Sequence, residues 1–124
     1  MKSNQTGVGR LVKATKYSWL GLKAAWHGEA AFRQEFVCFC VLTPIALALP
    51  VGGLAKLLLI GSLVAIMIVE LLNSAIEAVV DRIGYEKNEL SGRAKDMGSA
   101  AVLLSLLMAM FTWGYVLVSI LSRN

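Results

Sequence analysis

The stretch Val69-Glu-Leu-Leu-Asn-Ser-Ala-Ile-Glu-Ala-Val-Val-Asp-Arg-Ile83 decides the fold class. It contains the end of an apolar run, residues 57–80, in which Glu70 and Glu77 are the sole ionisable side chains. On either side of it, residues 36–55 and 97–122 carry no charge. A bilayer core about 30 Å thick requires about 20 apolar residues per helix, and all three runs are long enough. The sequence therefore predicts an all-α membrane protein with transmembrane helices over residues 30–49, 56–83 and 91–121.

The composition and the positions of the basic residues support this class and orient it. Of the 124 residues, 57% are hydrophobic and 16% are charged, whereas a soluble domain has about 45–50% apolar and about 25% charged residues. Ten of the twelve Lys and Arg residues precede the first apolar run, residues 36–55, or lie between the second and third runs, residues 57–80 and 97–122. Because such residues remain cytoplasmic, we expect the N-terminus and the second loop inside and the C-terminus outside. Charges that follow membrane boundaries argue against a nucleic-acid partner.

Residues 8–27 show an amphipathic helical pattern ahead of the first span. The apolar positions recur at helical spacing on one face and are Val8, Leu11, Val12, Trp19, Leu22 and Trp26. Lys16 and Lys23 flank this face, where their stems can lie along lipid while their ammonium groups stay in water. The pattern predicts an interfacial helix lying in the membrane surface, and a simple anchor explains the periodicity equally well. No repeat or linker divides the chain, so we expect one domain over residues 1–124.

Four polar residues of the second span fall on one helical face. At 100° per residue they form a narrow stripe made of Glu70, Asn73, Glu77 and Asp81. Carboxylates at membrane depth are costly and point to function. A stripe that only joins helices is the alternative, but two glutamates would do so cheaply only when protonated or bound to a cation. Glu70 and Glu77 lie about 10 Å apart along the axis, which favours two separate roles over one shared chelate.

The opposite charge comes from the start of the third span. Lys95 and Asp96 lie there at the cytoplasmic level of Glu77, and Glu29 and Glu35 reach the same level from the entry to the first span. A lysine can neutralise phosphate oxygens, and Mg²⁺ usually binds one or two carboxylates with waters and substrate phosphates. These residues suggest a cation-assisted site for a phosphorylated ligand. The chain has no G-x-x-x-x-G-K-[ST] loop, so a P-loop enzyme is excluded.

Three segments resemble the small membrane-embedded diacylglycerol kinases of prokaryotes. They are Glu29-Ala-Ala-Phe-Arg-Gln-Glu35, the stretch quoted above, and Glu89-Leu-Ser-Gly-Arg-Ala-Lys-Asp-Met-Gly-Ser-Ala-Ala-Val102. Tyr17-Ser-Trp19 and Ala24-Ala-Trp26 also look like positions of that family. The similarity covers nearly the whole chain, and residues 36–67 match mainly in hydrophobic character.

The resemblance implies an ATP- and Mg²⁺-dependent kinase that phosphorylates the hydroxyl of diacylglycerol to phosphatidic acid at the cytoplasmic face of a bacterial inner membrane, for lipid recycling. It also implies a homotrimeric helical bundle with shared active sites. By position, the catalytic residues would be Glu70 as general base, Asn73 and Lys95. The metal ligands would be Glu29 and Glu77. The nucleotide contacts would be Arg10, Tyr17, Glu29, Glu77, Glu86, Lys87, Asn88, Lys95 and Asp96. The lipid contacts would be Arg33, Gln34, Glu35, Glu70, Ser99 and Trp113.

Two alternatives stay open from the sequence. A related small membrane kinase would phosphorylate undecaprenol, although residues 24–35 with their tryptophan resemble the diacylglycerol branch. A small proton-coupled transporter, a protein of another class, would also use an intramembrane glutamate in a short oligomeric bundle. That alternative would place Glu70 near the bilayer midplane and would leave Lys95 and Asp96 without a role.

Overall fold

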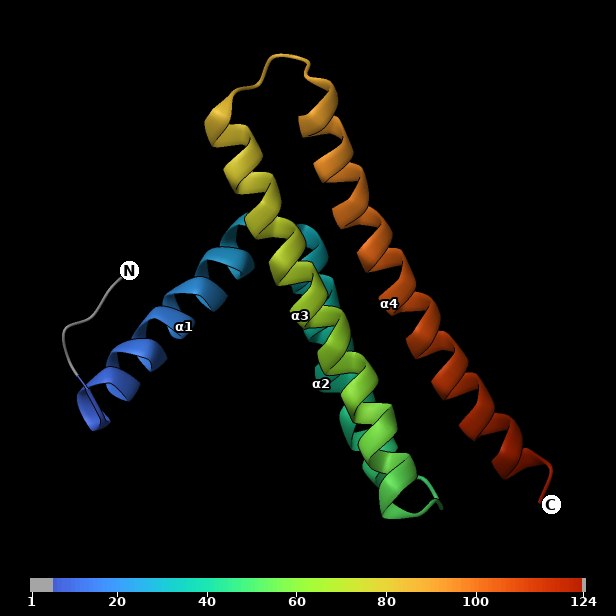
Figure 1. Cartoon of the computed structure of the whole chain (residues 1–124). Coiled ribbons are helices and arrows are strands. Elements are labelled where there is room, and N and C mark those ends of the chain that lie inside the picture. Colours follow the sequence, from blue (N-terminus) through green and yellow to red (C-terminus); the bar gives the residue numbers. More distant parts are fainter. Residues whose placement is uncertain (1–5, 124) are drawn as a thin grey trace.

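The computed structural model describes residues 6–123, and most of them are helical. Four helices follow one another along the chain (Figure 1): α1 (Val8–Gly28), α2 (Ala30–Ala48), α3 (Gly53–Ile83) and α4 (Glu89–Leu121). The last three are long and apolar enough to cross a membrane. The predicted all-α membrane architecture is therefore confirmed. The single domain predicted over residues 1–124 includes residues 1–5 and 124, which lie outside the described part.

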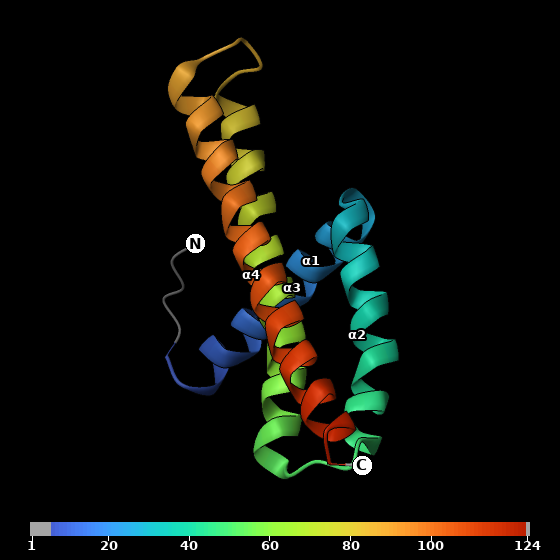
Figure 2. The same cartoon turned by 90° about the vertical axis from the view of Figure 1, so that its right-hand side faces the viewer.

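The three apolar helices differ in length, and this difference shapes the site. At 1.5 Å per residue, α2 spans about 28 Å, close to the thickness of the hydrocarbon core. By the same rise, α3 and α4 are about 46 and 50 Å long. The three helices end near one level at the α2–α3 turn and the C-terminus, whereas at the other end α3 and α4 extend beyond the start of α2 (Figures 1 and 2). About 18–22 Å of the α3–α4 pair therefore projects past α2.

Local chemistry at the helix ends explains the boundaries. Glu29 adopts an extended backbone conformation between α1 and α2, so the two helices are separate. The extended residue before α3 is Gly52, so this helix starts at residue 53, three residues earlier than predicted. Gly84 ends α3. Asn88 caps α4 because its Oδ1 accepts a hydrogen bond from the Ser91 backbone N–H at 3.1 Å, and α4 therefore starts two residues before the predicted boundary.

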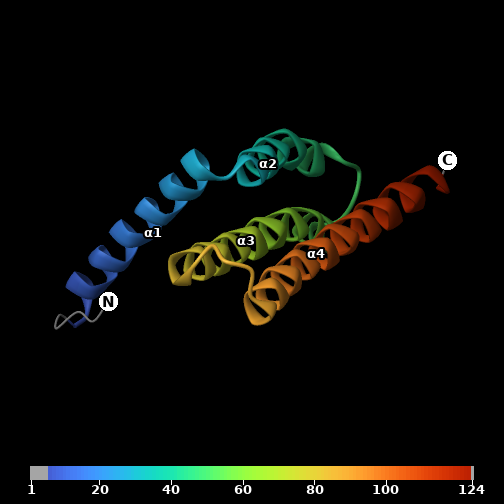
Figure 3. The same ribbon diagram turned by 90° about the horizontal axis from the view of Figure 1, so that it is seen from above.

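α3 is the centre of the bundle and packs along both α2 and α4, whereas α1 contacts mainly α2. Figure 3 shows α1 leading away from the other three helices. Toward the α2–α3 turn, Ala46, Leu59 and Val116 form a buried cluster with one residue from each spanning helix. The Trp113 indole Nε1 donates a hydrogen bond to the Leu59 carbonyl oxygen at 3.2 Å beside it. These contacts join the three helices at the end opposite to the charged residues.

Most large apolar side chains of the single chain lie on its outside. Leu57 of α3 and Phe111 of α4, for example, are 67% and 72% exposed. Contiguous exposed apolar surface marks contact with a membrane or with another protein chain. Leu11 and Trp19 of α1 are exposed as well, on the face that the sequence pattern assigned to the membrane surface. The fold therefore gathers its buried and half-buried acids toward one end of the bundle and exposes apolar side chains along the spanning helices.

Candidate functional site

The centre of the candidate site is Glu70 of α3, which is only 6% exposed. It lies about 26 Å along the helix axis from the start of α3, toward the end of the apolar run of α3 and near the junction of α1 and α2. Three other carboxylates lie close enough to interact with its charge: Glu77 of α3, Glu29 at the α1–α2 junction and Glu35 of α2. Four acids from two helices and one helix junction therefore gather where the spanning helices leave the hydrocarbon core.

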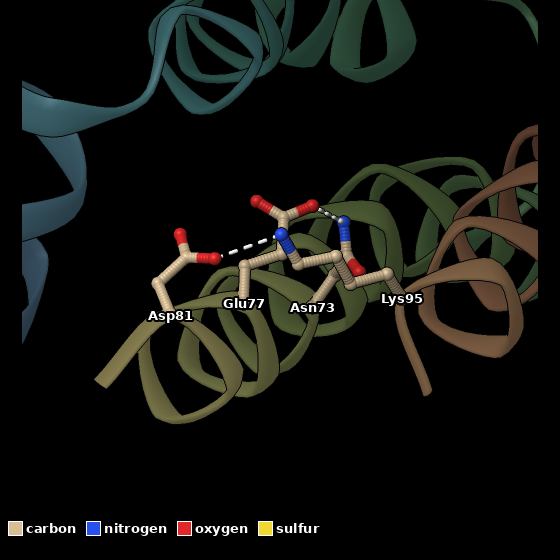
Figure 4. Close-up of polar contacts among 4 residues, drawn as sticks. All are labelled: Asn73, Glu77, Asp81 and Lys95. Carbon is tan, nitrogen blue, oxygen red and sulfur yellow. Dashed lines mark hydrogen bonds and ion pairs between the residues drawn. The ribbon is translucent and has the colours of Figure 1, made fainter. Parts of the chain in front are cut away.

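Asn73 lies on the same face of α3, between Glu70 and Glu77. Its Nδ2 donates a hydrogen bond to Glu77 Oε1 at 3.4 Å (Figure 4). Asn73 is buried because α4 covers it with Gly98, and a Cβ placed on Gly98 would overlap Asn73 Oδ1. A glycine in a membrane helix allows such a close approach of two helices. The register of α4 against α3 therefore depends on a residue without a side chain at position 98.

α4 contributes a cation to the same face of α3. Lys95 Nζ contacts Asp81 Oδ1 at 2.8 Å, and the two side chains are 44% and 37% exposed. Figure 4 shows Lys95 reaching across from α4 to the face that carries Asn73, Glu77 and Asp81. Asp81 belongs to the stripe that the sequence predicted, but its pairing with Lys95 was not predicted. The site thus extends from a buried acid to an ion pair within reach of water.

Three buried polar atoms in this region have no hydrogen-bond partner within the described chain: Glu35 Oε2, Asn73 Oδ1 and Ser74 Oγ. Buried polar groups in folded proteins are nearly always paired. Glu35 and Ser74 line open grooves, so their unpaired atoms can accept a hydrogen bond from a ligand or from a second subunit. Asn73 Oδ1 is instead packed against Gly98 of α4. Ser74 was not among the predicted site residues, since one serine on a helix gives no signal by itself.

Grooves open beside these acids. One of about 340 Å³ lies between α2, α3 and α4, and Glu35 is the single acid in a lining that includes Cys38 and Trp113. A second, of about 610 Å³, lies between α1 and α3 and contains Glu29 and Ser74 among small residues. A third, of about 490 Å³, is formed by α1, α2 and α3, with two tryptophans of α1 and two phenylalanines of α2 in its lining. Two of the four acids, Glu35 and Glu29, therefore each line a groove whose other residues are mostly apolar.

Three predicted site residues make other polar contacts within the chain. Arg33 Nη1 donates to the carbonyl oxygens of Trp26 at 2.7 Å and His27 at 3.4 Å, so it closes the C-terminal end of α1. Trp113 uses its indole N–H on α3, and Asn88 uses its side-chain oxygen to cap α4. Their polar groups therefore hold the fold together in this structure.

The remaining predicted contacts are exposed, and the structure does not bring all of them to the acidic cluster: Arg10 lies near the start of α1, about 27 Å along the helix axis from the α1–α2 junction. Within residues 6–123, no side-chain hydrogen bond or ion pair joins them to that cluster. They belong to α1, α2, the α3–α4 turn and the start of α4, and they are Arg10, Tyr17, Gln34, Glu86, Lys87, Asp96 and Ser99.

The acidic cluster does not form a protein-only metal cage. Residues 6–123 hold no group of three His, Cys, Asp or Glu side chains that could enclose an ion. Mg²⁺ does not require one, since it usually binds one or two carboxylates and completes its octahedron with water and substrate phosphates. Glu29 and Glu77 come from different segments and both lie within electrostatic reach of Glu70. This donor set fits Mg²⁺ held jointly with a phosphorylated ligand.

Fold and site together define a helical membrane protein with three spans and an acidic site where the spans reach one membrane surface. Comparison with known proteins narrows this class. The sequence pattern described as prokaryotic diacylglycerol kinase matches residues 16–117. This chain therefore belongs to the prokaryotic diacylglycerol kinase family.

Individual relatives agree with this family over almost their whole length. The diacylglycerol kinase of Escherichia coli strain K12 is 59% identical over 113 residues, which cover 91% of this chain and 93% of that protein. The diacylglycerol kinase of Haemophilus influenzae is 48% identical over 112 residues, covering 90% and 95% of the two chains. The diacylglycerol kinase of Helicobacter pylori strain J99 is 41% identical over 116 residues, covering 92% and 89%.

These relatives confirm the resemblance drawn from the sequence, and the protein is a membrane-bound kinase of bacterial type. The transporter alternative is not favoured. The matching family and the relatives are kinases. That alternative also left Lys95 without a role, whereas Lys95 is paired on the stripe of α3 that carries the acids.

Proposed function

We propose that this protein transfers the γ-phosphoryl group of ATP to the free hydroxyl of diacylglycerol, with phosphatidic acid and ADP as products. The observation that carries the proposal is the position of Glu70, a nearly buried carboxylate where the spanning helices leave the hydrocarbon core. A lipid hydroxyl lies at the same level, because the polar region of a bilayer begins at the edge of that core. The shared name of the relatives, diacylglycerol kinase, supports this substrate class.

In the proposed reaction, the lipid hydroxyl oxygen attacks the γ-phosphorus, and the bond from that phosphorus to the ADP oxygen breaks. Glu70 accepts the hydroxyl proton as general base. Positioning and electrostatic stabilisation supply most of the catalysis in phosphoryl transfer, so a small site is sufficient. Glu35 borders the apolar groove beside Glu70 and would hold the lipid headgroup. The other proposed lipid contacts are Arg33, Gln34, Ser99 and Trp113.

The nucleotide would bind at the segment of α3 and α4 that extends beyond α2. Glu29 and Glu77 would hold Mg²⁺, which neutralises phosphate charge when it is bound. The hydrogen bond from Asn73 to Glu77 orients that carboxylate, and Lys95 of α4 would contact phosphate oxygens. The other proposed nucleotide contacts are Arg10, Tyr17, Glu86, Lys87, Asn88 and Asp96.

The proposal includes a homotrimer with shared sites in the bacterial inner membrane, with the N-terminus and the α3–α4 turn in the cytoplasm. The distribution of Lys and Arg supports this orientation. The exposed apolar faces of α3 and α4 support contact with other subunits as well as with lipid. Ser74 Oγ, a buried polar atom without a partner in the described chain that lines an open groove, is a further position that a second subunit could satisfy.

A direct assay tests the substrate class. Purified protein in mixed micelles with diacylglycerol, MgCl₂ and γ-labelled ATP should form labelled phosphatidic acid. Undecaprenol at the same mole fraction addresses the prenol alternative and should be phosphorylated with a lower initial rate. An equal or higher rate on the prenol would overturn the diacylglycerol assignment. If neither lipid became labelled, the kinase proposal itself would fail.

A further inference from the structure

We propose that Asp81 is a positioning residue for Lys95 and holds its ammonium group where two N–H donors remain for nucleotide phosphates. This inference rests on the proposed function, because it takes Lys95 to be a phosphate contact. Asp81 is absent from the predicted metal, nucleotide and lipid contacts, and the reason to add it is structural. Its side chain makes the one ion pair that the described residues 6–123 contain.

The ion pair of Asp81 and Lys95 lies next to the proposed Mg²⁺ ligand on α3. Asp81 follows Glu77 by one helical turn on the same face of α3, and Lys95 reaches it from α4 with an N–O distance of 2.8 Å (Figure 4). The pair therefore lies one turn farther from the membrane than Glu77, on the segment of α3 and α4 that projects past α2. Both side chains are partly exposed, so a water-soluble ligand can reach them.

Lys95 has more hydrogen-bond donors than its contact with Asp81 uses. An ammonium group has three N–H donors and no acceptor, and the contact with Asp81 Oδ1 uses one donor. Two donors are left for phosphate oxygens while the contact with Asp81 persists. Asp81 can therefore fix the ammonium without competing for all of its hydrogen bonds.

Without Asp81, the ammonium group of Lys95 would have another acid within reach. A lysine is a point charge on a flexible four-carbon stem with high rotamer freedom. The nearest alternative acid on the same face is Glu77, one turn away, and Glu77 is the proposed Mg²⁺ ligand. Loss of the Asp81 charge would leave the ammonium mobile and let it pair with Glu77. We therefore expect loss of the Asp81 charge to lower the affinity for the nucleotide and to weaken the binding of Mg²⁺ at Glu77.

The opposite role is a latch, in which Asp81 withholds Lys95 until the nucleotide competes for it. A latch predicts that removing the Asp81 charge strengthens nucleotide binding. A positioning residue predicts that it weakens binding. The sign of a single change in affinity therefore separates the two roles.

The experiment measures binding of a fluorescent ATP analogue with MgCl₂ to the full-length protein in detergent micelles. Asp81→Asn should raise the Kd about five-fold, the scale that a partly exposed charge pair supports. Asp81→Glu keeps the charge and should restore most of the affinity. Glu89→Gln removes an exposed acid at the start of α4 and serves as the matched control, with an unchanged Kd. A lower or unchanged Kd for Asp81→Asn would overturn the proposal.

A double-mutant comparison excludes a general structural effect. In the Lys95→Met background, Asp81→Asn should cause no further change in Kd, because Asp81 acts through Lys95. An additional loss of similar size in that background would show that Asp81 acts otherwise. Binding does not require turnover, so the two hypotheses can fail separately. If the Asp81→Asn effect depends on Lys95 but no lipid is phosphorylated, the proposed function is rejected. If phosphatidic acid is labelled but the effect does not depend on Lys95, only the role of Asp81 is rejected.

Discussion

The close approach of α4 to α3 at Gly98 makes Gly98→Ala a sharp test of the helix packing. A Cβ at this position would overlap Asn73 Oδ1 and would lie 3.2 Å from Asn73 Cγ. Asn73 is buried, so either its side chain must turn away from Glu77 or α4 must move outward. Such overpacking typically costs about 1–3 kcal/mol. Replacing glycine by alanine inside a helix stabilises it by about 0.5–1 kcal/mol, so we expect the free energy of unfolding to fall by up to about 2.5 kcal/mol.

Gly114→Ala is the matched control, because Gly114 lies in the same helix and a Cβ there meets no atom within 4 Å in the described chain. This substitution should raise the free energy of unfolding by about 0.5–1 kcal/mol. Thermal unfolding of both variants in the same detergent compares them, and a titration with Mg²⁺ and ATP shows whether the Asn73–Glu77 contact has moved. Equal stabilisation by both substitutions would refute the close packing at Gly98. An unchanged Mg²⁺ titration in a destabilised Gly98→Ala variant would refute the link from that packing to Glu77.

Two further predictions follow from single contacts. Trp113→Phe removes the hydrogen bond to the Leu59 carbonyl and should lower the free energy of unfolding by about 1 kcal/mol. Tyr115→Phe, at an exposed position of α4, should leave it unchanged. Equal unfolding temperatures of the two variants would argue against a stabilising role for that bond. Glu77→Gln should raise the Mg²⁺ concentration needed for half-maximal lipid phosphorylation several-fold, because one proposed carboxylate ligand loses its charge; an identical Mg²⁺ curve would reject Glu77 as a ligand.

The fold was largely predictable because long apolar runs have few structural solutions. Residues 57–80 contain two charges in 24 positions, and only a helix satisfies its own backbone hydrogen bonds at membrane depth. The boundaries were less predictable. α4 begins at residue 89, two residues before the predicted start, because the side chain of Asn88 caps it. α3 begins at Gly53, three residues before the predicted start at residue 56.

The site was predictable along one helix and less so between helices. The stripe from Glu70 to Asp81 follows from helical spacing alone. The contact of Lys95 with Asp81 requires the register of α4 against α3, which depends on the turn between them and on the approach at Gly98. The role of Arg33 at the end of α1 likewise requires the direction of the chain at the α1–α2 junction. Helical periodicity contains none of this information.

The most direct test of the central claim is the turnover of Glu70→Gln in mixed micelles with diacylglycerol and MgCl₂. The substitution keeps the size of the side chain and removes its ability to accept the hydroxyl proton. We predict that kcat falls at least about 100-fold, while the Kd for Mg²⁺-ATP stays within about two-fold because Glu70 is not among the proposed nucleotide contacts. Turnover equal to that of the unmodified protein would contradict the assignment of Glu70 as the base.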